Sequence, residues 1–119
     1  MTIETRVFIQ NILKNEFNPI QDEIYAIVPE GRRDIAIARA WIESKGKTIL
    51  FLVWKRNSGR LKYVQLKKVT NRKELHVDQI VVQNGMVIVS IDAGEGYNRR
   101  HLMEKREIPL KELKGLKKK

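Results

Sequence analysis

The feature that most constrains this fold is a series of glycine-containing turns, which divides the chain after residue 22 into short β-rich runs. The turns are Lys45-Gly46, Ser58-Gly59 and Asn84-Gly85. The last is the strongest signal, because both central residues of a type I′ hairpin turn need φ > 0. The pattern predicts strands over residues 23–28, 35–43, 48–56, 61–69, 75–83 and 86–92, paired as an antiparallel meander.

Helical patterns flank this strand-rich region. Residues 3–17 place apolar side chains on one side of a helix, which Asn18-Pro19 would end. Residues 35–43 could also be helical, with Asp34 as a cap and Gly46 as a stop, although a strand is favoured. Residues 99–108 are compatible with a seventh strand, and Pro109 can open a short helix. The prediction is an α+β fold, with an N-terminal helix packed on a mainly antiparallel meander sheet of six or seven strands.

The length and composition narrow the class of protein. A chain of 119 residues is long enough for one core, so we expect a single domain over residues 1–116 and a basic tail over 117–119. Cysteine is absent, which excludes disulfides, thiolate metal sites and a cysteine nucleophile. No apolar run approaches the ~20 residues that cross a bilayer, so the default expectation is a cytoplasmic protein.

The positive charge is concentrated in the second part of the chain. Residues 1–54 hold seven basic and seven acidic side chains, whereas residues 55–119 hold seventeen basic and seven acidic ones. The second part therefore carries the whole net charge of +10. A surface of this charge attracts polyanions, of which nucleic acid is the commonest.

The predicted hairpins imply a register for three strands. If Lys45-Gly46 and Ser58-Gly59 are two-residue loops, Trp41 lies opposite Leu50 and Trp54 lies opposite Tyr63. One sheet face then gathers Arg39, Trp41, Trp54, Arg56, Tyr63, Gln65 and Lys67. The other face is a predicted core face, made of Ala36, Ala38, Ala40, Ile42, Ile49, Phe51, Val53, Val64 and Leu66, against which the N-terminal helix can lie.

Aromatic rings interleaved with cations on one face are typical of surfaces that bind single-stranded nucleic acid. In this hypothesis Trp41, Trp54 and Tyr63 stack on bases. The phosphates are contacted by Arg39, Lys55, Arg56, Arg60, Lys62 and Lys67. The alternative is that the three rings form a second core layer under a loop or a partner copy, in a small homodimeric interaction or structural protein without a nucleic-acid role.

Two further basic groups bear on this hypothesis. Lys55 is expected opposite Lys62 near the Ser58-Gly59 turn, where like charges favour a bound anion, although a solvated hairpin end has the same pattern. Arg99 and Arg100 follow a glycine-rich stretch and form either a second phosphate clamp or part of a disordered connection.

Catalytic signals are sparse. His76 and His101 are the only histidines, no metal-ligand spacing is present, and no nucleotide-binding glycine motif occurs, so no cofactor, metal or catalytic residue is predicted. A metal-dependent nuclease of the type with Asp and Glu-x-Lys on adjacent strands is a second alternative. The corresponding strand reads Leu-Val-Trp-Lys at residues 52–55, with Val where the acid should be, which disfavours it.

Two stretches carry a family resemblance. Residues 47–66, Lys-Thr-Ile-Leu-Phe-Leu-Val-Trp-Lys-Arg-Asn-Ser-Gly-Arg-Leu-Lys-Tyr-Val-Gln-Leu, resemble the basic and aromatic hairpin of PUR-type single-strand-binding repeats. Residues 85–116 are similar in outline to the coactivator PC4 group, with a basic strand, a loop, another strand and a C-terminal helix in order. The resemblance implies a curved antiparallel sheet, usually dimeric, that binds single-stranded DNA or RNA along its concave face.

Overall fold

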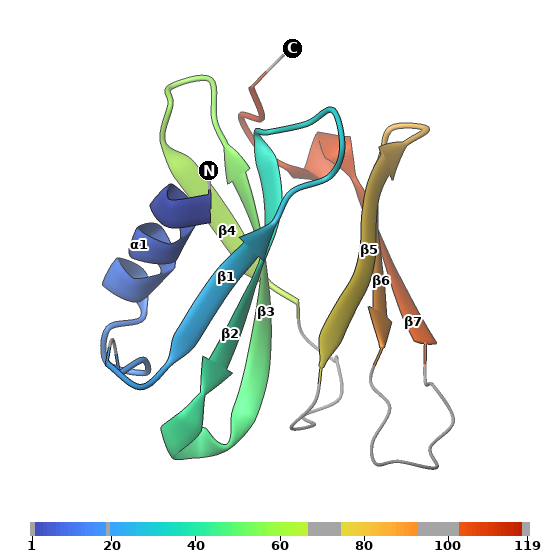
Figure 1. Ribbon diagram of the computed structural model, residues 1–119. Coiled ribbons are helices and arrows are strands. Elements are labelled where there is room, and N and C mark those ends of the chain that lie inside the picture. Colours follow the sequence, from blue (N-terminus) through green and yellow to red (C-terminus); the bar gives the residue numbers. More distant parts are fainter. Residues whose placement is uncertain (1, 19, 67–74, 93–102, 118–119) are drawn as a thin grey trace.

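The chain forms one helix and seven strands that are arranged in two antiparallel sheets. The computed structural model describes residues 2–18, 20–66, 75–92 and 103–117 (Figure 1). Its elements are α1 (Thr2–Ile12), β1 (Glu23–Ile27), β2 (Ile35–Ile42), β3 (Lys47–Lys55), β4 (Leu61–Gln65), β5 (His76–Gln83), β6 (Met86–Asp92) and β7 (Met103–Pro109), with the 3-10 helices η1 (Glu43–Lys45) and η2 (Leu110–Glu112). The predicted α+β class is confirmed.

Consecutive strands pair as predicted, except that β4 and β5 lie in different sheets, so the prediction of a single sheet is wrong. The first four strands form one sheet in the order β1-β2-β3-β4, and the last three form another in the order β5-β6-β7. Figure 1 shows the two sheets facing each other, with α1 on the outer side of the four-stranded sheet. The four-stranded sheet is therefore the middle layer of three, and both of its faces are covered.

The central strand β3 shows why this arrangement is stable. Every residue from Thr48 to Trp54 is buried, rather than every second one. Phe51 and Val53 pack with Ile9 of α1 on one face. Leu50, Leu52 and Trp54 pack on the other face against the second sheet, through Ile80, Val87, Val89 and Ile91. A strand with two buried faces needs an uninterrupted apolar run, which residues 49–54 supply.

The hairpins differ in how well local turn chemistry predicts them. Asn84 and Gly85 both have positive φ, at 52° and 72°, and join Gln83 directly to Met86 as the predicted two-residue turn. Residues 35–42 form a strand, as favoured, and not a helix. The β2–β3 connection spans residues 43–46, because η1 precedes Gly46, so Trp41 lies opposite Thr48 rather than Leu50.

The β3–β4 hairpin departs from the predicted register by one residue. Lys55 pairs with Leu61, so five residues, 56–60, make the connection instead of two. Trp54 consequently pairs with Lys62, and Tyr63 pairs with Val53. Because side chains alternate along a strand, this odd shift moves Tyr63 to the opposite face of the sheet.

The helices near the two ends of the chain are also shorter than predicted. The helix stops at Ile12 rather than residue 17, and the C-terminal helix is the single 3-10 turn η2. No helix within the described residues is long and apolar enough to span a membrane.

Candidate functional site

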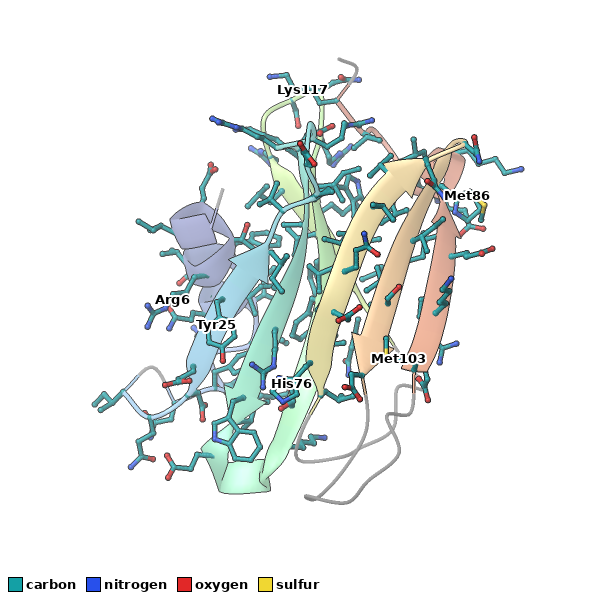
Figure 2. The ribbon with its side chains drawn as sticks, turned by 45° about the vertical axis from the view of Figure 1, so that its right-hand side comes forward. Arg6, Tyr25, His76, Met86, Met103 and Lys117 are labelled. Carbon is teal, nitrogen blue, oxygen red and sulfur yellow. The ribbon has the colours of Figure 1, made fainter. Side chains whose placement is uncertain are left out.

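One end of the molecule collects basic side chains from three distant segments. These segments are the β3–β4 connection (56–60), the β1–β2 loop (28–34) and the C-terminal segment 110–117, which is called the strap below. All three lie together at the top of Figure 1, and Figure 2 labels Lys117 there. This region is called the basic end.

Backbone hydrogen bonds hold the strap against β3 and the β3–β4 connection. The amide of Asn57 donates to the carbonyl oxygen of Gly115 at 2.8 Å, and the amide of Lys117 donates to the carbonyl oxygen of Lys55 at 3.0 Å. Leu113, which is 4% exposed, anchors the strap in the core between the sheets. Lys117, predicted to begin a solvated tail, is thus part of the ordered structure.

A glycine in the strap allows Arg56 to approach closely. Gly115 has a φ of +73°, and a Cβ at this position would lie 2.9 Å from Nε of Arg56. Arg56 also forms an isolated antiparallel bridge with Leu116. The backbone of the strap therefore fixes where the Arg56 side chain leaves the sheet.

Apart from Arg32 and Lys111, seven cations lie in these segments or at the adjoining ends of β3 and β4, and all are at least partly exposed. They are Arg33, Lys55, Arg56, Arg60, Lys62, Lys114 and Lys117. Arg33, Lys55 and Lys117 line one hollow together, and Lys62 and Lys114 line another. In the described part of the chain, none of the seven forms an ion pair. Their charges are therefore available to an external anion.

Acidic residues at this end offset part of the charge. Asp34 accepts two hydrogen bonds from Arg32, at 2.9 and 2.7 Å, in a bidentate pair. This hydrogen bonding raises the pKa of Arg32, so the pair stays charged. Glu4 and Glu30 line the neighbouring hollows, the larger of which is about 770 Å³ and opens between the β1–β2 loop and Lys117.

The predicted stacking surface of Trp41, Trp54 and Tyr63 does not form. Trp54 is only 4% exposed and lies between the two sheets, where its indole N–H donates to the carbonyl oxygen of Lys114 at 3.1 Å. Tyr63 faces α1 instead and packs edge-on against Phe51 and Phe8, with ring centroids 5.8 and 5.9 Å away. The cause is the one-residue register shift together with the second sheet, which covers the face that was expected to be open.

The other predicted site residues separate into two groups. Arg39 and Trp41 lie on β2 toward the end opposite the basic end, where Arg39 donates to the Tyr25 hydroxyl at 2.8 Å and stacks over its ring. Lys55 and Lys62 do not face each other, because Lys55 pairs with Leu61, and they point to opposite sheet faces. Lys67, Arg99 and Arg100 lie outside the described residues.

Sequence reasoning missed Arg33 and Lys114 as members of the site. Arg33 lies in the β1–β2 loop, which is far from the β3–β4 hairpin in the sequence. Lys114 lies near this hairpin only because the strap folds back against it. The spacing of Leu110, Leu113 and Leu116 indicated packing of this segment, and Gly115 between them was an available signal for a close approach. Within the described residues, no cluster of three or more His, Cys, Asp or Glu side chains could hold a metal ion.

Comparisons with known proteins add no relatives. No protein-family model, no curated protein and no solved structure matches this chain.

Proposed function

We propose that this protein binds nucleic acid without catalysis, and that the basic end makes the principal contacts with the phosphates. The observation that carries the proposal is the convergence of seven cations, from three segments and the adjoining ends of β3 and β4, without ion-pair partners among the described residues. The strap is central, because it brings Lys114 and Lys117 to the hairpin that carries Lys55 and Lys62.

A concentration of unpaired cations favours a polymeric anion over a small one. Each phosphate contact releases a condensed counterion, so several contacts made together give substantial affinity at low salt. Exposed cations that repel one another at one end of a protein are relieved when phosphates lie between them. The excess of positive charge over the whole chain, +10, also accelerates the encounter with a polyanion.

The expected ligand is single-stranded DNA or RNA. The three segments of the basic end lie together at one end of the molecule rather than along a sheet face (Figure 1). A duplex is stiff over about 150 base pairs, so it would touch such an end at few points. A flexible single strand can follow the surface and reach more of the cations.

Paired variants with equal net charge test the proposal. The first replaces Arg60, Lys62 and Lys114 with Gln. The control replaces Arg6, Lys14 and Lys105, which are also exposed but lie on α1, after α1 and on β7. Binding of labelled single-stranded and duplex oligonucleotides is measured by anisotropy as the salt concentration is varied.

The two triple variants should behave differently. Each lost phosphate contact on a single strand reduces the slope of log K against log salt by about 0.7, so the basic-end variant should lose about 2 units of slope. The control should lose much less. Equal losses in both variants would point to diffuse charge rather than a site, and no binding by the unchanged protein at low salt would overturn the proposal.

A further inference from the structure

The hollow that Lys62 and Lys114 share is an apolar groove. It has a volume of about 300 Å³ and opens between β4 and β7, which are edge strands of the two sheets. Val64 of β4 and Ile108 of β7 form its sides, and Leu113 of the strap and Trp54 lie beneath. Tyr63 of β4 also lines the groove, although its ring packs toward α1. Figure 1 shows these edges at the side where the strap crosses from the second sheet to the first.

The chemistry of this groove differs from that of the rest of the basic end. Val64 is 44% exposed, which is high for an apolar residue beside the core of a protein. Lys62 is partly exposed and Lys114 is exposed, and both line the groove together with Glu112. An apolar interior with cations at its opening fits a flat apolar group that is attached to negatively charged groups.

A nucleobase in a single strand is such a group. Its faces are apolar and its sugar is bonded to phosphates on both sides. The volume of the groove is at the lower limit for small-ligand sites, which suits one base rather than a larger ligand. A paired base has its faces covered by its neighbours in the stack and could not enter.

We propose that this groove accepts one unpaired nucleobase from the strand held at the basic end. Val64, Ile108 and Leu113 contact the base, and Lys62 and Lys114 contact the flanking phosphates. Trp54 supports the groove from below, because the bond from its indole N–H to Lys114 fixes the position of the strap. This inference rests on the proposed nucleic-acid function and supplies the reason for a single-strand preference.

The first experiment compares two ligands with the same number of phosphates. Oligothymidylate and an abasic oligonucleotide of equal length are titrated into the unchanged protein at several salt concentrations. Base insertion predicts about tenfold tighter binding of oligothymidylate, with similar salt slopes for both ligands. Because the chain has two tryptophans, a Trp41→Phe background leaves Trp54 as the reporter, and its emission should change with oligothymidylate only.

The second experiment fills the groove. Val64→Phe adds a ring at its side, and Val7→Phe adds the same bulk at a position that is 47% exposed on α1. The Val64 variant should lose most of the preference for oligothymidylate over the abasic strand and keep its salt slope. The Val7 variant should keep both.

The outcomes separate this inference from the proposed function. Equal affinity of the unchanged protein for both strands would overturn the base-binding groove while leaving phosphate binding intact, and this comparison needs no variant to fold. Retention of the preference in a folded Val64→Phe protein would also overturn the groove. Failure of both strands to bind at low salt would overturn the groove and the proposed function together.

Discussion

The indole N–H of Trp54 donates a hydrogen bond to the carbonyl oxygen of Lys114, 3.1 Å away and sixty residues later in the sequence. This bond joins the core between the sheets to the strap that carries two of the cations at the basic end. Trp54 therefore contributes to the proposed site by positioning the strap, rather than by offering an open ring face.

Trp54→Phe should lower the free energy of unfolding by about 2 kcal/mol, because the carbonyl of Lys114 loses its donor and the core loses volume. Urea unfolding measures the change. Trp41→Phe is the control, since Trp41 is half-buried toward the other end of β2 and should cost less. Equal costs for the two variants would contradict the structural role of the Trp54 bond.

Gly115→Ala should destabilise the strap by about 1–2 kcal/mol from the positive φ alone. The new methyl would also press on Nε of Arg56. Gly59→Ala is a matched control, because Gly59 has a φ of +86° but open space around its Cβ position. Thermal unfolding should show a larger loss for Gly115→Ala, and its nucleic-acid affinity should fall while that of Gly59→Ala is retained. If the two variants matched in both measurements, the contact between Arg56 and the strap would have no consequence.

Tyr63→Ala should reduce stability by about 2 kcal/mol, since Tyr63 packs edge-on against Phe8 and Phe51 and joins β4 to α1. Although Tyr63 lines the proposed groove, its ring packs toward α1 against Phe8 and Phe51. Nucleic-acid affinity, measured on the folded fraction at low temperature, should therefore stay within about twofold of the unchanged protein. Tyr63→Phe keeps the ring and should keep the stability. A large loss of affinity in Tyr63→Phe would restore a direct role for this residue in binding.

The Arg32–Asp34 pair gives a prediction about pH. The pKa of Arg32 is raised by its hydrogen bonds to Asp34, so its contribution to stability is fully present below the ordinary arginine pKa and is lost only as the pH rises through the raised value. The difference in unfolding free energy between the unchanged protein and Arg32→Gln should therefore be constant over roughly pH 7 to 10. Chemical denaturation at each pH measures this difference. A difference that declines across this range would show that Arg32 is not the group that holds the pair together.

The sequence also contained evidence against the predicted base-stacking face, namely the aliphatic residues that share this face. On the face assigned to Trp41 and Trp54, the alternation of side chains also places Ile35, Ile37, Leu50 and Leu52. Four aliphatic side chains on one sheet face favour burial over an open aromatic surface. The continuous apolar run at residues 49–54 is likewise typical of a strand covered on both faces.

The amino-acid sequence by itself determined the local elements, namely the strands and the type I′ turn at Asn84-Gly85. It also determined the face of β2 that packs toward α1, where Ala36, Ala38 and Ala40 are buried. These features depend on backbone preferences and side-chain alternation over a few residues. Only the tertiary structure decided the register of β3 and β4, the division into two sheets and the place of the strap. Each of these depends on packing between segments far apart in the chain, and a one-residue shift in the pairing register of β3 and β4 was enough to move Tyr63 from the expected face to the other.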